Sequence, residues 1–187
     1  MNQTQLVVAV IDALNETRVP YLLAGSLAAN IYSIPRSTKD ADFVVEMDAA
    51  ALGRLASLLD AHFELDPQQH LETSTWTRRY IWKARETPFD VELFLKSDDP
   101  HHQEQWGRRR EIFIEVLSRK TWVPTPEDIV IQKLRWGRAK DLTDAAALIS
   151  VRGMLLDWPY IEKWCGIHGS LPRLEAIKAA LPADLRP

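Results

Sequence analysis

The chain has a single cysteine, Cys165, among its 187 residues. One thiol excludes an intramolecular disulfide and a zinc site built from cysteines. The sequence also lacks an apolar run of about 18 residues, the length that a membrane-spanning helix needs. Its first residues, Met-Asn-Gln-Thr-Gln, lack the basic and apolar regions of a secretion signal. We therefore expect a cytoplasmic protein that makes no use of a membrane.

The sequence shows no strong excess of charge of either sign. A formal net charge of −3 gives no indication that the whole chain binds nucleic acid or a membrane surface. Internal repeats and low-complexity segments are also lacking. Apolar residues make up 46% and charged residues 26%, as in ordinary globular proteins. This length suffices for one core, or for one domain with a helical appendage.

The most informative stretch lies near the N-terminus. A short apolar run ends in Gly25-Ser26, a helical segment follows, and a second apolar run carries Asp40 and Asp42. Side chains two residues apart in a strand project from the same face. Two neighbouring carboxylates repel each other unless a cation lies between them, and Mg²⁺ prefers carboxylate oxygens together with substrate phosphates. Asp40 and Asp42 are therefore candidate metal ligands.

Gly25-Ser26 lies at a strand-to-helix junction, where backbone N–H groups and the helix dipole favour a phosphate. Ser26 is a candidate cap of the helix and a candidate hydroxyl donor to the β- or γ-phosphate, and the two roles are compatible. Arg36 either neutralises the carboxylates or reaches a triphosphate, and Thr38 either serves the nucleotide or fills a strand position. Together these residues predict a metal–phosphate site.

Six residues carry a resemblance to a known family: Gly25, Ser26, Arg36, Thr38, Asp40 and Asp42. Their order and context resemble the nucleotidyltransferase superfamily, and within it the small bacterial branch of AbiE-type (AbiEii-like) toxins. The resemblance covers about residues 20–150. It implies an α/β (α+β) fold with a mixed sheet flanked by helices, followed by a C-terminal helical bundle.

This resemblance implies an enzyme that moves a nucleoside monophosphate from a nucleoside triphosphate (NTP) to an acceptor hydroxyl. The implied cofactor is Mg²⁺ or Mn²⁺, held by Asp40, Asp42 and a third carboxylate. The acceptor is RNA (such as a tRNA), a protein or a small molecule, and a cognate antitoxin is an implied partner. The competing hypothesis is a non-catalytic protein of the same fold that binds a nucleotide or a partner.

The third carboxylate is expected on the strand predicted for residues 89–95, where Asp90 and Glu92 share one face. Taken alone, this pattern indicates a strand with a solvated acidic face. The resemblance makes Asp90 the first candidate for the third metal ligand and for the acceptor of the substrate proton. Glu92 is the second candidate, and the sequence leaves the choice open.

Two further candidates lie near a predicted helix–turn–helix. Taken alone, Lys133 and Asp141 are ordinary surface charges and caps. The resemblance instead implies that Lys133 contacts phosphate and that Asp141 faces the site, both reaching toward the carboxylates. Lysine supplies a point charge suited to phosphate.

Periodicity and capping signals place the remaining elements. They predict an α/β core over residues 1–123 and a helical region over 124–187 that packs on it. Residues 66–74 and 98–110 are polar and predict loops. The other expected elements are helices over 5–18, 49–62, 125–136 and 139–151, short helices reaching about 165 and 181, and strands over 75–84 and 111–118.

Overall fold

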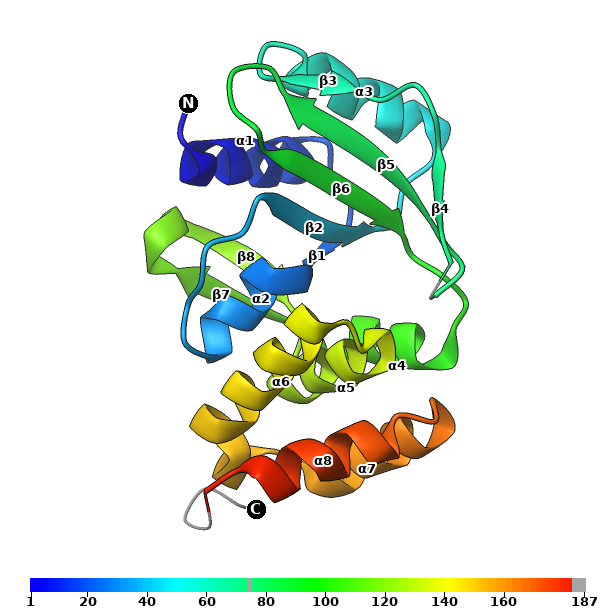
Figure 1. Ribbon diagram of the computed structural model, residues 1–187. Coiled ribbons are helices and arrows are strands. Elements are labelled where there is room, and N and C mark those ends of the chain that lie inside the picture. The colour runs from blue at the N-terminus through cyan, green and yellow to red at the C-terminus, as the bar shows by residue number, and fades with distance from the viewer. Residues whose placement is uncertain (74, 183–187) are drawn as a thin grey trace. The chain divides into compact units, whose positions relative to one another are not determined.

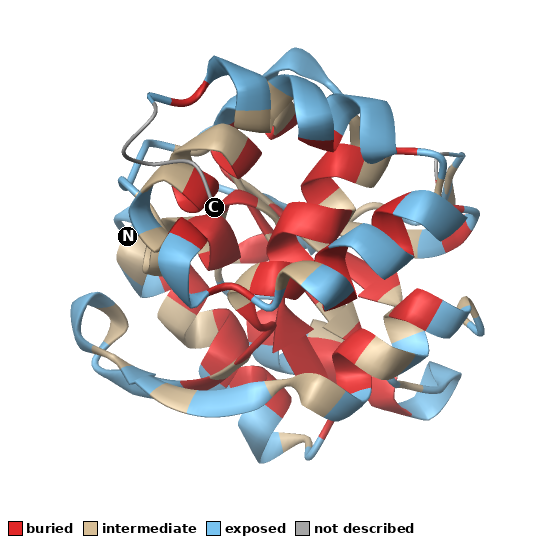
Figure 2. Cartoon of the chain, turned by 90° about the horizontal axis from the view of Figure 1, so that it is seen from below, coloured by how far each residue is buried: buried red, intermediate tan, exposed pale blue. Residues whose placement is uncertain are grey.

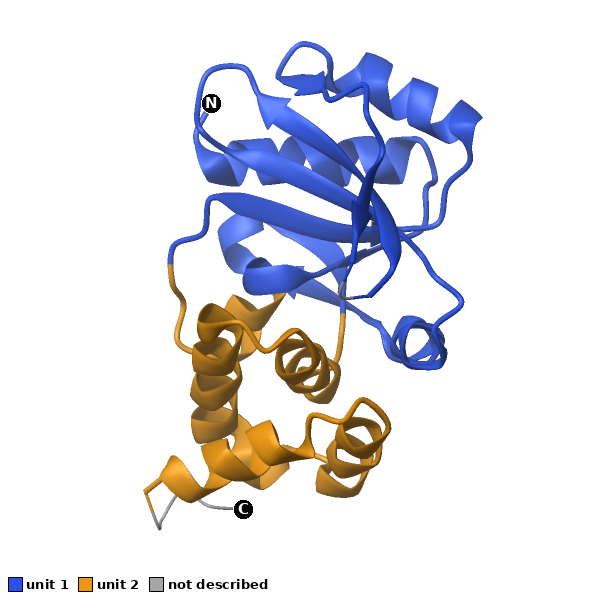
Figure 3. Cartoon of the chain, turned by 45° about the vertical axis from the view of Figure 1, so that its right-hand side comes forward, with its two compact units in different colours: residues 1–27, 37–123 blue, residues 28–36, 124–187 orange. Residues whose placement is uncertain are grey.

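The structure is a computed structural model, and it describes residues 1–73 and 75–182. The chain divides into two compact units, which Figure 3 colours blue and orange. Unit 1 comprises residues 1–27 and 37–123, and unit 2 comprises residues 28–36 and the described part of 124–187. Ser74, the last residue of one predicted loop, lies outside the described residues.

Unit 1 contains a mixed sheet, a two-stranded ribbon and several helices (Figure 1). Its strands are β1 (Tyr21–Leu23), β2 (Asp40–Val45), β3 (Phe63–Leu65), β4 (His70–Glu72), β5 (Thr77–Ala84), β6 (Asp90–Leu95), β7 (Arg110–Ile114) and β8 (Arg119–Val123). Its helical elements are α1 (Gln3–Glu16), α3 (Ala49–Leu59), α4 (Pro100–Arg108) and the 3₁₀ turn η1 (Glu115–Leu117), whereas α2 (Gly25–Tyr32) starts in unit 1 and continues into unit 2.

The sheet has the strand order β1-β2-β6-β5-β3, and β4 also pairs with β5. Only the pair β2–β6 is parallel among these described strands. Strands β5 and β6 lie where the sequence predicted strands over 75–84 and 89–95, and they pair with each other antiparallel. Strands β7 and β8 pair only with each other.

One face of the sheet forms the core of unit 1. Phe43 and Val45 of β2 and Val91 and Leu93 of β6 are fully buried. They alternate with polar residues along each strand, so they all project from the face that packs in the core. Helices α1 and α3 lie on this side of the sheet (Figures 1 and 3). The alternate residues therefore project from the opposite face.

Unit 2 is helical in its C-terminal part. Thr125 caps the first helix by accepting a hydrogen bond from the Asp128 amide, and Pro126 occupies its first turn, where the sequence predicted a helix over 125–136. Figure 2 shows helices with a buried side in red and an exposed side in pale blue. The elements are α5 (Pro126–Trp136), α6 (Ala139–Arg152), the 3₁₀ turn η2 (Gly153–Leu155), α7 (Trp158–Ile167) and α8 (Leu171–Ala180).

The structure corrects the prediction of a loop over residues 98–110. Helix α4 lies there, because Asp99 accepts hydrogen bonds from the amides of His101 and His102 and Pro100 occupies the first turn. The loop predicted for 66–74 contains the short strand β4. Among the described residues, none of the helices has the length and hydrophobicity that crossing a membrane requires.

Candidate functional site

Four acidic side chains lie on the parallel strands β2 and β6. In the register of this pair, Asp40 lies opposite Asp90, and Asp42 lies opposite Glu92. Paired residues on neighbouring strands project from the same face of a sheet. All four are partly exposed, and they project from the face opposite the core. The structure thus brings the four carboxylates predicted from sequence into one place in unit 1.

Two of these carboxylates have partners that distinguish them. The Thr38 hydroxyl donates a hydrogen bond to Asp40 Oδ1. Glu92 Oε2 lies 2.9 Å from Nη1 of Arg79, whose guanidinium also lies over the Phe94 ring. Thr38 therefore orients Asp40, whereas Arg79 neutralises Glu92.

Arg79 was not predicted from the sequence. In the structure, Arg79, Ile81 and Lys83 alternate along β5 and pair with Phe94, Glu92 and Asp90. This register places Arg79 on the same face as the carboxylates. The placement of Arg79 beside the carboxylates could be recognised only once the register between β5 and β6 was known.

The turn between β1 and α2 packs directly against Asp42. Gly25 has a φ of +59°, in the left-handed region, and a Cβ at this position would lie 1.8 Å from Asp42 Oδ2. The Ala24 amide donates a 2.8 Å hydrogen bond to the Asp42 carbonyl oxygen. Glycine is therefore required here for its backbone conformation and for the space that the Asp42 carboxylate occupies. The neighbouring Ser26 is buried.

The donors at this face fit a hard divalent cation. Carboxylates are preferred ligands of Mg²⁺, which commonly takes one or two of them and completes its shell with water and substrate phosphates. Within residues 1–73 and 75–182, no group of three or more His, Cys, Asp or Glu side chains forms a ready-made metal site. The arrangement therefore suits a cation that is also bound by the phosphates of a substrate. It does not resemble a site in which protein side chains supply every ligand.

Three other predicted residues, Arg36, Lys133 and Asp141, lie together in unit 2. Lys133 Nζ donates hydrogen bonds of 3.1 Å to Asp141 and 2.7 Å to Asp144. Arg36 forms a bidentate pair with Asp144, at 2.6 Å from Nε and 2.9 Å from Nη2. Arg138 makes a similar pair with Asp141, at 2.6 and 3.3 Å. We call these five residues the ion-pair cluster.

Both carboxylates of the ion-pair cluster are stabilised in their charged form. Burial alone would raise the pKa of Asp141, but hydrogen bonds from Arg138 and Lys133 outweigh it and hold this pKa below its ordinary value. Burial likewise opposes ionisation of Asp144, and hydrogen bonds from Arg36 and Lys133 lower its pKa overall. Both side chains are therefore carboxylates at neutral pH.

Asp144 was missed from the sequence, although a signal for it existed. It follows Asp141 by three residues on α6, and residues at this spacing share one side of a helix. Its main partner, Arg36, is 108 positions away. The helical spacing could indicate a pair of aspartates, but not the arginine that binds one of them.

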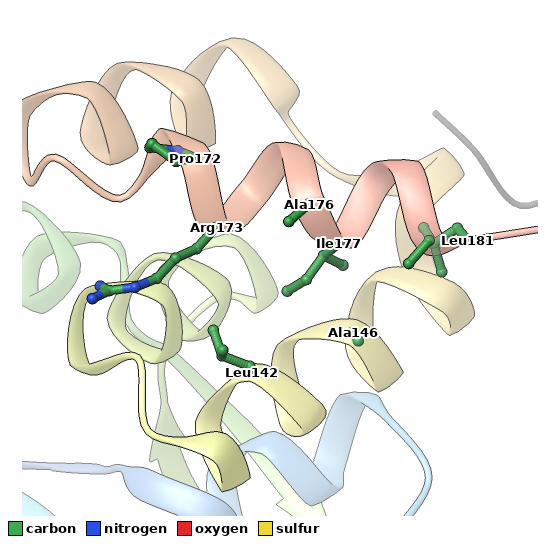
Figure 4. Close-up of a pocket in the computed structure, with 8 residues that line it drawn as sticks. Leu142, Ala146, Pro172, Arg173, Ala176, Ile177 and Leu181 are labelled. Atoms are coloured by element: carbon green, nitrogen blue, oxygen red, sulfur yellow. The ribbon is translucent and has the colours of Figure 1, made fainter.

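Unit 2 also has a pocket of about 460 Å³ between α6 and α8. Figure 4 shows Leu142 and Ile177 projecting into this space. The side chain of Arg173 lines one end, and its Nη1 donates to the carbonyl oxygen of Leu134 at 2.8 Å. The lining is otherwise aliphatic, so this pocket lacks groups that could bind a metal or carry out catalysis.

Comparison with known proteins adds evidence about the fold. No family model matches the chain, and no curated protein matches it. Solved structures do match. One is the antibiotic-resistance factor ANT(2'')-Ia in complex with adenylyl-2''-tobramycin, with 12% identity, 91% of this chain and 98% of that chain covered, and a TM-score of 0.63.

Two further structures are similar over most of their length. An antigenic nucleotidyltransferase-like protein from Paracoccidioides brasiliensis has 19% sequence identity and a TM-score of 0.58, and the match covers 98% of this chain and 96% of that chain. The lincosamide antibiotic adenylyltransferase LnuA, bound to lincomycin, has 15% sequence identity and a TM-score of 0.54, and the match covers 79% of this chain and 96% of that chain. The narrower resemblance to the AbiE-type branch stays a prediction. The chain has the nucleotidyltransferase fold, a mixed sheet flanked by helices, as its sequence predicted.

Proposed function

We propose that this protein is a metal-dependent nucleotidyltransferase that moves a nucleoside monophosphate from an NTP to an acceptor hydroxyl. The observation that carries the proposal is the placement of Asp40, Asp42 and Asp90 on one sheet face, on adjacent parallel strands of a nucleotidyltransferase fold. A cation bound beside like-charged carboxylates offsets their mutual repulsion.

Asp40, Asp42 and Asp90 would hold Mg²⁺ or Mn²⁺. When bound, such a metal would supply positive charge that stabilises the nucleotide phosphates and the leaving pyrophosphate. Thr38 orients Asp40 through its hydroxyl. Gly25 lets the backbone approach the triphosphate, and the amides that begin α2 donate to it, together with Ser26.

In the proposed reaction, the acceptor oxygen forms a bond to the α-phosphorus of the NTP. The bond between this phosphorus and the oxygen that bridges to the β-phosphate breaks, and pyrophosphate leaves. The acceptor proton passes to a carboxylate acting as general base. The products are a nucleotidylated acceptor and pyrophosphate.

We assign the role of general base and third carboxylate to Asp90. Glu92 lies 2.9 Å from Arg79, and this ion pair lowers its value as a proton acceptor. Asp90 lies opposite Asp40 in the register of the parallel pair. Of the two candidates that the sequence left open, we therefore propose Asp90 rather than Glu92.

Substituting Asp90 and Glu92 in separate variants should show which of the two acts as general base. We expect Asp90→Asn to lower kcat by at least about 100-fold, the loss typical when one charge-stabilising group leaves an active site. Glu92→Gln should lower kcat only a few-fold, and loss of its partly exposed ion pair should destabilise the protein by no more than about 1 kcal/mol. Steady-state transfer rates and thermal melts of both variants test this assignment. A larger loss of kcat in Glu92→Gln would reverse it.

Three classes of acceptor substrate stay predicted: RNA such as tRNA, protein, and a small hydroxylated molecule. Two proteins of similar fold, named above, were solved with adenylyl-2''-tobramycin and with lincomycin. These structures support including small molecules among the candidate acceptors. A cognate antitoxin also stays a predicted partner.

The function is tested by incubating the purified protein with each α-³²P-labelled NTP and Mg²⁺ or Mn²⁺. Total bacterial RNA, cell lysate, tobramycin and lincomycin serve as separate acceptors. We expect label to move to one acceptor class, with release of pyrophosphate, and to require the metal. Absence of transfer with every nucleotide, metal and acceptor would refute the proposal, and NTP binding without transfer would support the non-catalytic alternative.

A further inference from the structure

The pocket between α6 and α8 belongs to unit 2 alone, and Figure 4 shows aliphatic side chains of both helices beside it. Its volume of about 460 Å³ lies within the range typical of sites for small ligands. The short side chains of Ala146, Ala176 and Ala180 leave this space open. Among the described residues that line it, none is acidic, and Arg173 carries the one charge. The pocket thus combines aliphatic walls with a positive group at one end.

Arg173 is held in place by the end of α5. Its Nη1 donates hydrogen bonds of 2.8 and 3.3 Å to the carbonyl oxygens of Leu134 and Arg135, in the last turn of that helix. A Cβ at Gly137 would lie 2.5 Å from Arg173 Cζ and 2.8 Å from both Nε and Nη1. These nearly equal distances place Gly137 against the flat face of the guanidinium, so a larger residue would overlap it. Arg173 is therefore fixed through one nitrogen and one face.

The opposite edge of the Arg173 guanidinium, formed by Nε and Nη2, has no hydrogen-bond acceptor among the described residues. Arg36, Arg119 and Arg138 each use this same edge to bind an aspartate. The edge presents two parallel N–H donors that match the oxygens of a carboxylate or a phosphate. Arg173 is exposed to solvent, so an anion can approach it.

We propose that this pocket binds an aliphatic carboxylate. The carboxylate pairs with the Nε and Nη2 edge of Arg173, and the hydrocarbon chain lies between α6 and α8. A neutral apolar molecule would leave the guanidinium edge without an acceptor, whereas a small anion would leave the aliphatic walls in contact with water. A phosphate that carries an aliphatic chain shares this chemistry. Binding requires neither a nucleotide nor the carboxylates of unit 1, so it does not depend on the proposed function.

Calorimetric titration of the full chain with hexanoate, octanoate and decanoate tests the proposal. We expect one ligand to bind per chain, with a Kd that falls by about fourfold for each added methylene group, the gain typical of burying one CH₂. Decanol has the chain of decanoate without the charge and should bind at least about 10-fold more weakly. Decyl phosphate should bind no more tightly than decanoate. Tighter binding of decyl phosphate would assign the pocket to aliphatic phosphates and overturn the choice of a carboxylate.

Two substitutions remove the two halves of the site separately. Arg173→Gln should raise the Kd for decanoate by about 10–100-fold, the range typical for loss of a hydrogen bond to a charged group, and should leave the Kd for decanol nearly unchanged. Ala146→Leu fills the pocket and should raise the Kd for both molecules by at least about 10-fold, since it displaces methylene groups of the ligand. Ala146 is only half-buried, so this variant keeps the proposal testable if Arg173→Gln does not fold.

Arg119→Gln and Ala139→Leu are the matched controls. Arg119 binds Asp12 in unit 1, and Ala139 is exposed at the start of α6 and does not line the pocket. Both variants should bind decanoate as the wild type does. Absence of saturable binding by the wild type, or an unchanged Kd for decanoate in folded Arg173→Gln and Ala146→Leu, would overturn the proposal.

Sedimentation of the wild type and of Ala146→Leu tests a different occupant of the same pocket. We expect the substitution to leave the oligomeric state unchanged. If the wild type forms a dimer that Ala146→Leu disrupts, and decanoate does not bind, a second copy of the chain covers the pocket and the proposal is refuted.

Discussion

Replacing Asp42 with asparagine should abolish nucleotide transfer while leaving the fold intact. Asp42 lies on the face of the sheet opposite the core, on the same strand face as Asp40 and opposite Glu92 in the register. Asparagine has the same shape but lacks the negative charge, so the proposed metal ligand is lost without a change of packing. We expect transfer to fall by at least about 100-fold. The melting temperature should change by only a few degrees, since about 1 kcal/mol corresponds to roughly 2–4 °C for a chain of this size.

Asp48→Asn is the control for this experiment. Asp48 follows β2 by three residues and caps α3 by accepting a hydrogen bond from the Ala51 amide at 2.7 Å. Asparagine caps helices as well as aspartate does. We expect this variant to transfer nucleotide at the wild-type rate. Wild-type transfer by the Asp42 variant as well would rule out a metal role for Asp42.

Replacing Gly25 with alanine should have an effect of similar size on transfer, for a steric reason. The new Cβ would lie 1.8 Å from Asp42 Oδ2 and 2.7 Å from Asp42 Cγ, so the carboxylate would have to move. The left-handed backbone costs an alanine about 1–2 kcal/mol, and relief of the overlap costs about 1–3 kcal/mol. We therefore expect lower stability, in a thermal melt, together with loss of transfer.

A glycine in α3 provides the control for the alanine substitution. A Cβ at Gly53 would meet nothing within 4 Å, and alanine favours a helix over glycine by about 1 kcal/mol. Gly53→Ala should be fully active and slightly more stable. If Gly25 acts through Asp42, the double variant Gly25→Ala/Asp42→Asn should transfer no less than Asp42→Asn alone. Wild-type transfer by Gly25→Ala would refute the role given to this turn.

Much of the fold was predictable from local patterns. The order of apolar run, glycine turn, helix and acidic strand defined β1, α2 and β2, because each depends on residues close in sequence. Capping signals located the start of α5 at Thr125 and Pro126 in the same way. The helix α4 was missed because polar composition obscured an equally local signal, the Asp99-Pro100 start.

The candidate site was predictable only in part. Period-two spacing placed Asp40 with Asp42, and Asp90 with Glu92, but it could not show that the two strands are neighbours. Likewise, Lys133 and Asp141 were singled out without Asp144, the residue that joins Lys133 to Arg36. Their predicted roles toward a nucleotide stay predictions.

The sequence by itself determined which residues share a strand face, where most of the helices start and that Gly25 lies at a strand-to-helix junction. These properties follow from backbone geometry over a few residues. Only the tertiary structure decided that Asp40 lies opposite Asp90, that Arg79 neutralises Glu92 and that Asp144 binds Arg36. Such contacts depend on strand order, register and helix packing, which arise from burial of apolar surface by segments far apart in the chain and leave no local pattern in the sequence.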